Sequence, residues 1–151
     1  MNIVLVEPEI PQNTGNIARL CALTSTHLHL VGPLGFSLSE KHLKRAGMDY
    51  WEHVEYTTWK SWDEWISQYQ DRRLFFFTTK TNQSFLQAQF QPDDFLVFGR
   101  ESRGLSEAIL RQFPENLVTI PMPGQSGRSL NLATSVGIGL YEAMRQADVI
   151  R

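Results

Sequence analysis

The sequence is poor in cysteine, and this scarcity limits the chemistry that it can perform. Cys21 is the only cysteine among 151 residues, so an internal disulfide framework is excluded. A chain without disulfides suits a reducing compartment, and we therefore expect a cytoplasmic protein. Cys21 also falls on the apolar stripe of an expected helix, which favours buried packing over a role as a nucleophile.

Long apolar runs and a surplus of positive charge are missing as well. No run approaches the roughly 20 residues that cross a bilayer, and residues 1–8 lack the basic start and cleavage site of a signal peptide. We therefore expect a complete chain with no membrane partner. The formal net charge is −2 and the pI is about 6.1, whereas proteins that coat nucleic acid indiscriminately are usually strongly basic.

Any nucleic-acid contact must therefore depend on local basic groups. Three clusters could supply it, although each of them alone also fits an ordinary solvated surface. These clusters are Lys41, Lys44 and Arg45, then Arg72 and Arg73, and then Arg100, Arg103 and Arg128.

Several signatures of catalysis are absent. The sequence has no Gly-Lys-Ser/Thr phosphate loop, no Gly-x-Gly-x-x-Gly dinucleotide fingerprint and no Gly-x-Ser-x-Gly nucleophile elbow. Its four histidines have neither a cysteine partner nor a His-x-x-x-His spacing, so we expect no metal site.

Apolar runs alternate with helical patterns from one end of the chain to the other. Near-continuous apolar runs are typical of a parallel sheet covered on both faces, and they predict strands over residues 2–6, 28–31, 73–77, 95–98 and 117–120. Helices are predicted over residues 16–23, 59–69 and 130–147 and between Ser106 and Pro114. The alternation predicts a single α/β domain over residues 1–151.

Two of the expected helices carry unusual residues. The aromatic stripe within residues 59–69 predicts a packed face rather than a binding surface. Gly137 and Gly139 lie in the middle of the last helix, where each glycine costs about 0.8–1 kcal/mol relative to alanine. They predict a close approach by another backbone, such as a helix of a second subunit, or by a cofactor.

Three polar segments follow apolar strands, at the place where open α/β sheets bind ligands. In residues 7–19, Gly15 permits a tight turn and Asn16 can cap a helix, although an ordinary strand-to-helix loop also explains this segment. In residues 98–106, a structural turn explains the glycines but not the Arg-Glu-x-Arg between them, which favours a functional role. In residues 120–132, a helix begins near Ser129, and its free amides can receive an anionic group.

Taken together and in this order, the three segments resemble the motifs of the SPOUT class of RNA methyltransferases. The sequence is most similar to the minimal enzymes that methylate the ribose 2′-hydroxyl of cytidine or modified uridine at position 34 of certain leucine tRNAs. The resemblance spans nearly the whole chain. It is carried by residues 7–21, by Leu-Lys-Arg-Ala-Gly-Met-Asp-Tyr at 43–50, by Phe-Gly-Arg-Glu-Ser-Arg-Gly-Leu at 98–105, and by Ile-Pro-Met followed by Arg-Ser-Leu-Asn-Leu within 120–132.

This resemblance implies a fold, a cofactor and partners. The fold would be a parallel sheet with helices on both faces and a C-terminal deep trefoil knot, in a homodimer that acts on tRNA. The cofactor would be S-adenosylmethionine, bound by Phe77, Thr78, Gly99, Ile120, Met122, Ser129 and Leu130. The catalytic pattern of the family falls on Asn13, Arg19, Glu101, Ser129 and Asn131.

The implied reaction requires a 2′-hydroxyl to lose its proton while it attacks a methyl group in line. The family assigns the base to the position of Arg19, but a guanidinium stays protonated. Arg19 could instead grip the phosphate beside the target ribose, and that phosphate would relay the proton. Asn13, Glu101 and Asn131 would orient the loops, and Ser129 would support the ribose or the cofactor.

The sequence departs from the family pattern at two places, which leaves the RNA target open. Arg100 and Ser102 replace the usual proline and threonine, and the loop at residues 123–128 is slightly longer. The same chemistry on another RNA, such as ribosomal RNA, is one alternative, and a catalytically silent nucleotide or RNA binder on this fold is another. The presence of Arg19, Glu101 and Asn131 together favours an enzyme.

Overall fold

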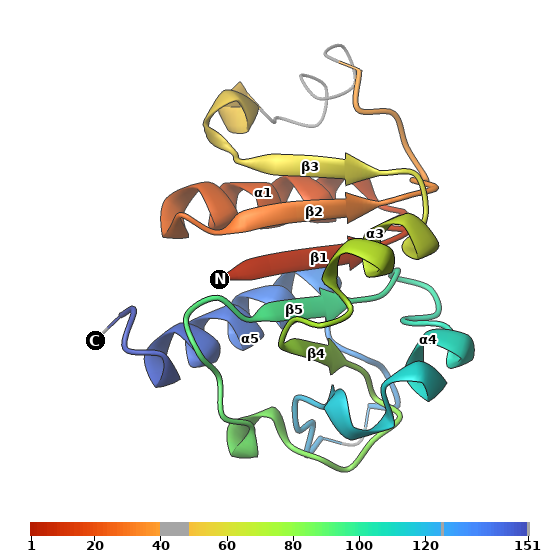
Figure 1. Cartoon of the computed structure of the whole chain (residues 1–151), viewed down its shortest axis with the longest axis vertical. Coiled ribbons are helices and arrows are strands. Elements are labelled where there is room, and N and C mark those ends of the chain that lie inside the picture. The colour runs from red at the N-terminus through yellow and green to blue at the C-terminus, as the bar shows by residue number, and fades with distance from the viewer. Residues whose placement is uncertain (40–48, 125, 151) are drawn as a thin grey trace.

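The computed structural model describes residues 1–39, 49–124 and 126–150, so the cluster of Lys41, Lys44 and Arg45 and most of the 43–50 motif lie outside the described residues. All strands of the sheet are parallel, and Figure 1 shows them side by side in the order β3-β2-β1-β5-β4-β6. They are β1 (Asn2–Val6), β2 (His27–Val31), β3 (Tyr56–Trp59), β4 (Leu74–Phe77), β5 (Phe95–Phe98) and β6 (Leu117–Val118).

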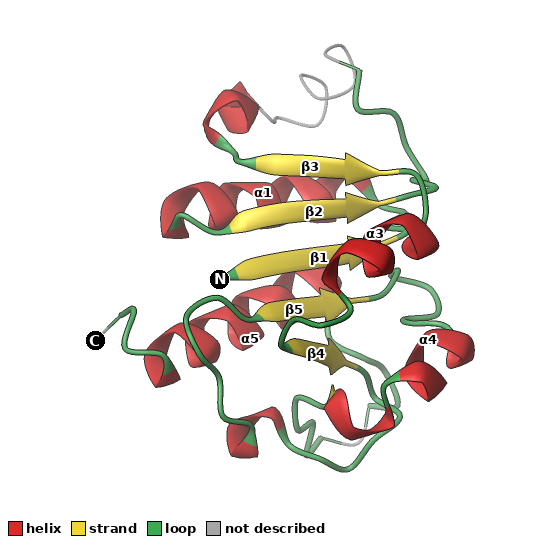
Figure 2. Ribbon diagram, in the orientation of Figure 1, coloured by secondary structure: helices red, strands yellow, loops and turns green. Residues whose placement is uncertain are grey.

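Helices cover both faces of this sheet, as the sequence predicts (Figure 2). Helices α1 (Pro11–Thr24) and α5 (Leu132–Gln146) pack against each other on one face. Helices α3 (Trp62–Tyr69) and α4 (Glu107–Gln112) lie on the other. Short 3-10 turns complete the chain at η1 (Asp49–His53), η2 (Phe85–Gln87) and η3 (Pro114–Asn116).

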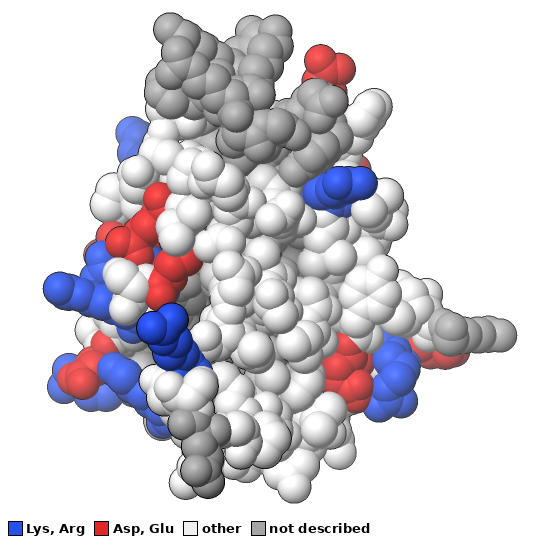
Figure 3. Space-filling view, turned by 180° about the vertical axis from the view of Figure 1, so that it is seen from behind, with Lys and Arg blue, Asp and Glu red and all other residues white. Residues whose placement is uncertain are grey.

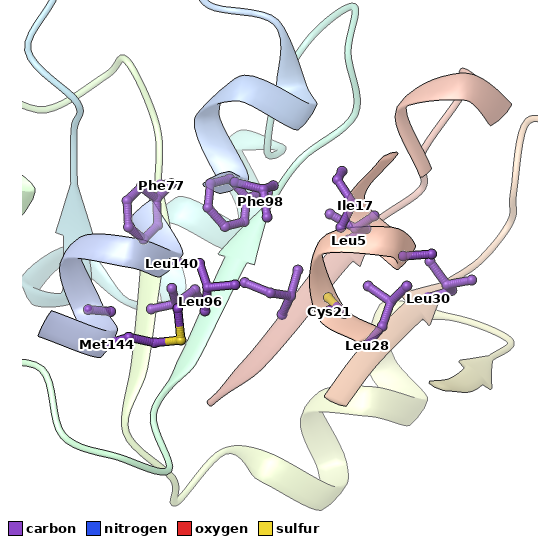
Figure 4. Packing of buried hydrophobic residues seen from close by; sticks show 14 of the residues in the cluster. Leu5, Ile17, Cys21, Leu28, Leu30, Phe77, Leu96, Phe98, Leu140 and Met144 are labelled. Carbon is purple, nitrogen blue, oxygen red and sulfur yellow. The ribbon is translucent and has the colours of Figure 1, made fainter. Parts of the chain in front are cut away.

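Two hydrophobic cores lie on the two sides of the sheet. In the first, side chains of β1, β2 and β5 meet those of α1 and α5, as Figure 4 shows for Leu5, Leu96, Ile17 and Leu140. Cys21 is buried in this core, and burial raises the pKa of its thiol to about 12, which confirms the prediction of a packing role.

The region of residues 56–69 differs from the prediction of one helix over 59–69. Strand β3 ends at Trp59, and Ser61 caps a shorter helix by accepting a hydrogen bond from the Glu64 N–H at 3.2 Å. The aromatic spacing of the helix extends into the strand as far as Trp59. Strand β3 is partly exposed at the sheet edge and is not an apolar run, so the sequence pattern does not reveal it as a strand. The packed aromatic face is confirmed, because Trp65 is fully buried against Tyr69 and Phe95.

Helix α1 also begins earlier than predicted. It starts at Pro11, which is suited to the first helical position because the fixed φ of proline matches the helix. The predicted turn at Gly15 and cap at Asn16 are therefore wrong, since both residues lie inside the helix. The chain turns instead at Glu7, whose φ is 54°.

In the C-terminal helix α5, the close neighbour of Gly139 lies within the same chain. A Cβ atom on Gly139 would lie 3.0 Å from the ring of Phe77, so the close neighbour is an aromatic side chain of the same chain. This ring accounts for the small residue at Gly139, whereas a Cβ atom on Gly137 would meet no atom of this chain within 4 Å, so an approach by a second subunit or a cofactor stays a prediction. The implied trefoil knot stays a prediction. None of the helices in the described ranges has the length and apolar character needed to cross a bilayer.

The second core contains a buried histidine that makes folding sensitive to acid. His29 Nδ1 accepts hydrogen bonds from the indole N–H groups of Trp59 (3.1 Å) and Trp65 (3.2 Å). Burial lowers the pKa of His29 to about 4, and the nearby His27 lowers it further in the same direction. The folded chain therefore stays unprotonated at His29 where the unfolded chain takes up a proton.

We expect this group to remove stability as the pH falls from about 6.5 to about 4, by at most about 3 kcal/mol. Denaturant titrations of the wild type and of His29→Gln across that range would measure it, because glutamine keeps an acceptor but does not titrate. The stability of the variant should depend less steeply on pH. Identical pH dependence in the two proteins would show that His29 is not responsible.

Candidate active site

A pocket of about 610 Å³ lies beyond the carboxyl ends of β4, β5 and β6, which is the expected ligand position in a parallel sheet. Its size is ordinary for a site that binds a small molecule. Four separate parts of the chain line it. They are Ile10 and Asn13 at the start of α1, residues 77–80 after β4, residues 98–105 after β5, and Thr119, Ile120, Met122, residues 128–132 and Ser135 towards α5.

The pocket gathers almost all of the residues that the sequence singles out. Every residue expected to bind the cofactor lines it, namely Phe77, Thr78, Gly99, Ile120, Met122, Ser129 and Leu130. Of the residues expected to act in catalysis, Asn13, Glu101, Ser129 and Asn131 line it too. Arg19 does not, because it lies further along α1 on the exposed side of that helix.

Glu101 ties the loop after β5 to the start of α1. One carboxylate oxygen accepts the backbone N–H of Glu9 at 2.8 Å. The other accepts the backbone N–H of Ile10 at 2.7 Å and the Nδ2 amide of Asn13 at 3.2 Å. All three partners are donors, and an ionised carboxylate only accepts, so the arrangement suits a charged Glu101.

Asn13 carries this connection on to the last helix. Its Oδ1 accepts a hydrogen bond from Nδ2 of Asn131 at 3.0 Å. Asn131 is also the N-cap of α5, where its Oδ1 accepts the backbone N–H of Thr134 at 3.2 Å. Glu101, Asn13 and Asn131 therefore form one chain of hydrogen bonds, the carboxylate–amide network, which joins three segments at the pocket.

Glu9 is a site residue that sequence reasoning missed. Its Oε1 accepts hydrogen bonds from the backbone N–H of Ser102 at 2.9 Å and from the Ser102 hydroxyl at 2.7 Å. These bonds lower the pKa of the Glu9 carboxyl. Since Glu9 also donates its own N–H to Glu101, the two loops hold each other reciprocally. The two glutamates are 92 residues apart, so no local pattern could have revealed the pair.

Gly99 allows the loop after β5 to fold back on itself. A Cβ atom at Gly99 would lie 2.0 Å from the carbonyl carbon of Gly104 and 2.1 Å from the nitrogen of Leu105. Gly104 has a φ of +67° and donates its N–H to the Arg100 carbonyl at 2.8 Å. Only glycine fits at position 99 without moving this backbone.

The pocket also offers apolar surface. Met122 is 38% exposed and Leu130 is 36% exposed, and both line the pocket beside Ile120. Apolar walls with a few convergent polar groups are typical of sites for small organic ligands. Within the described ranges, no three His, Cys, Asp or Glu side chains are grouped so that they could hold a metal ion.

Arg19 belongs to a different surface, the outer face of α1 and α5. Figure 3 views the molecule from this side and shows a broad area without charged side chains. Apolar residues are exposed here, including Leu23 (77%), Tyr141 (48%) and Ile138 (38%). We call this surface the α1/α5 face, and its outward residues are Gln12, Asn16, Arg19, Leu23, Thr134, Ile138, Tyr141 and Arg145.

Comparison with known proteins agrees with this geometry. A sequence model described as the SpoU rRNA Methylase family matches residues 1–141. A protein of Methylovorus glucosotrophus named tRNA (cytidine(34)-2'-O)-methyltransferase is 51% identical over 148 residues, which cover 97% of this chain and 96% of that protein.

Solved structures share the fold. One from work on the 2-OH methylation of C/U34 on tRNA is 46% identical, has a TM-score of 0.90 and covers 99% of this chain and 97% of its own. A more distant one, the AviRb methyltransferase of Streptomyces viridochromogenes in complex with AdoMet, is 24% identical with a TM-score of 0.82, covers 100% of this chain and 59% of its own, and supports the fold alone. The predicted resemblance to SPOUT methyltransferases is thus confirmed, and the chain belongs to the SpoU rRNA methylase family.

Proposed function

We propose that this chain transfers a methyl group from S-adenosylmethionine to the ribose 2′-hydroxyl of nucleotide 34 in tRNA, at cytidine or modified uridine in leucine tRNAs. One observation carries the proposal most directly. Ten residues predicted from the motifs, drawn from four parts of the chain, line one pocket at the carboxyl ends of parallel strands. The relative from Methylovorus glucosotrophus is named for the same reaction on cytidine 34.

The residues of the pocket fit S-adenosylmethionine. Ile120, Met122 and Leu130 would enclose the adenine ring, and their exposed apolar surface supports this role. Backbone groups around Gly99 and Thr78 would hydrogen-bond to the polar edge of the ligand. Bound there, the cofactor would supply the methyl group on its sulfonium.

The carboxylate–amide network would position the reacting groups. Glu101 and Asn131 hold the loops on either side of the pocket through Asn13, so the substrates meet in a fixed geometry. Ser129 lines the same pocket and would support the target ribose or the cofactor. A fixed arrangement matters here because the 2′-hydroxyl must approach the methyl carbon in line.

The chain would work as a homodimer through the α1/α5 face. Exposed Leu23, Ile138 and Tyr141 give this face apolar surface that a second copy can cover. Arg19 lies on the same face and outside its own pocket. We infer that Arg19 serves the pocket of the second copy, as the base or as a grip on the phosphate beside the target ribose.

Because the proposed substrate is tRNA, we place the protein in the cytoplasm. The free, buried thiol of Cys21 is compatible with a reducing compartment. No residue of the proposed mechanism requires a metal ion.

The first test is methyl transfer from labelled S-adenosylmethionine to bulk tRNA, followed by nuclease digestion and nucleoside analysis. We expect a labelled 2′-O-methylnucleoside, and partial digestion of purified leucine tRNA to oligonucleotides should place the label at position 34. Ribosomal RNA offered in parallel should stay unlabelled. Transfer to ribosomal RNA instead would replace the substrate, and cofactor binding without any transfer would point to a silent binder.

Cofactor binding should depend on the shape of the loop after β5. In Gly99→Ala, the added Cβ would displace the backbone of Gly104 by about 1 Å or more, and we expect cofactor affinity to fall on the order of a hundredfold. Gly124→Ala is the matched control, since nothing lies within 4 Å of a Cβ there. Ile120→Arg should also block binding. Calorimetric titration measures affinity, and thermal melting separates lost binding from lost folding.

Arg19→Ala should abolish methyl transfer without weakening cofactor binding, because Arg19 is outside the pocket. Mixed dimers of Arg19→Ala and Ile120→Arg, purified through two different tags, provide a sharper test. If Arg19 acts across the interface, one of the two sites is complete, and about half of the wild-type activity should return. Inactive mixed dimers would mean that Arg19 does not act on the second copy.

A further inference from the structure

Positive charge is concentrated at the pocket. Lys80, Arg100, Arg103 and Arg128 line it beside one carboxylate, Glu101, although the chain as a whole has a formal net charge of −2. Lys80 has an acidic neighbour, because its Nζ lies 3.9 Å from Glu107. The remaining cations, Arg100, Arg103 and Arg128, form what we call the arginine rim.

Among the described arginines, those of the rim share with Arg19 and Arg72 the lack of an ion-pair partner, whereas three others are paired. Within the described residues, none of its three members has a carboxylate within salt-bridge distance. By contrast, Arg73 pairs with Asp94, Arg111 with Glu107 and Arg145 with Glu142. The guanidinium groups of the rim therefore keep their hydrogen-bond donors available for a ligand.

The nearby carboxylates of Glu9 and Glu101 accept hydrogen bonds from groups other than the rim arginines. Glu101 accepts three N–H groups of the 9–13 segment, and Glu9 accepts two hydrogen bonds from Ser102. The charges of Arg100 and Arg103 lower the pKa of Glu9 less than the hydrogen bonds from Ser102 do. The acidic side chains closest to the rim are thus occupied with backbone and side-chain donors.

Hydrogen bonds of the loop also fix the backbone positions of Arg100 and Arg103. Glu101 and Ser102, which separate Arg100 from Arg103, are both hydrogen-bonded to the 9–13 segment. The Arg100 carbonyl accepts the Gly104 N–H, which closes the turn. Two cations on an ordered turn lose less conformational entropy when they bind than two on a flexible loop.

We propose that the arginine rim binds the phosphates of the RNA backbone on either side of the nucleotide whose ribose enters the pocket. This inference rests on the proposed function. A guanidinium matches a phosphate with two parallel hydrogen bonds, and such contacts set the register of a nucleic acid without reading its sequence. The rim also explains how a chain of negative net charge can hold a polyanion.

Binding of fluorescently labelled tRNA, measured by anisotropy over a salt series from about 50 to 200 mM, tests the rim without requiring turnover. Arg100→Ala, Arg103→Ala and Arg128→Ala should each weaken binding on the order of tenfold. Each should also reduce the slope of log affinity against log salt by about 0.7, the value for one contact to a single strand. The affinity for S-adenosylmethionine should not change.

Arg72→Ala is the matched control. Arg72 is exposed and precedes β4, at the end of the strand opposite the pocket, so tRNA affinity and salt slope should stay at their wild-type values. Unchanged tRNA binding in all three rim variants would overturn the inference, and so would a loss of cofactor affinity. Failure of the proposed function is a separate result, namely that the wild type transfers no methyl group to RNA.

Discussion

The capture of backbone amides at the start of α1 by the Glu101 carboxylate is the interaction on which the site depends. The first N–H groups of any helix have no partner within the helix. Ile10, the N-cap of α1, has no side-chain group that could accept them. Glu101, from the loop after β5, accepts instead the backbone N–H groups of Ile10 and of Glu9 just before the helix, and its negative charge is favourable at a helix N-terminus. One carboxylate thus holds the start of a helix and shapes a pocket.

The shape of the pocket depends on hydrogen bonds between segments that are far apart in the sequence. Asn13 links the capped start of α1 to Asn131, which caps α5. Glu9 returns the connection by holding Ser102 in the same loop that carries Glu101. Both glutamates act between loops far apart in sequence, and the pairing of β1 with β5 brings these two loops side by side. A change at one residue of the network is therefore expected to disturb its neighbours more than their individual bonds suggest.

Much of this organisation could be predicted from the sequence, where a single local signal dominated. The central strands β1 and β5 are nearly continuous apolar runs, which are typical of strands buried on both faces of a parallel sheet. The three polar segments after strands were located because ligands of parallel sheets bind there. The failures arose where two local signals conflicted. The glycine and cap signals at residues 15 and 16 favour a loop at Pro11, although proline also starts helices, and the aromatic spacing of the helix extends to Trp59, which lies in a strand.

Other features could not be predicted at all, because they depend on contacts between distant residues. Nothing in the spacing of Glu9 or Ser102 indicates their hydrogen bonds, since the partners meet only in the folded sheet. The interior glycine indicates a close neighbour at Gly139, but nothing local indicates that this neighbour is the Phe77 ring of another element. The resemblance to a family could supply pocket residues, but it gave no physical reason for them.

The distribution of charge indicates how such a small chain could select its RNA. A negative net charge disfavours indiscriminate contact with a polyanion, and screening limits this effect to about 8 Å at physiological ionic strength. The arginines at the pocket act within that distance, so attraction would become strong only when a phosphate backbone fits against the pocket itself. Under the proposed function, binding then requires an RNA whose shape presents one nucleotide to the pocket and its flanking phosphates to Arg100, Arg103 and Arg128. An exposed loop meets that requirement better than a regular duplex, whose 2′-hydroxyls lie along a continuous shallow groove.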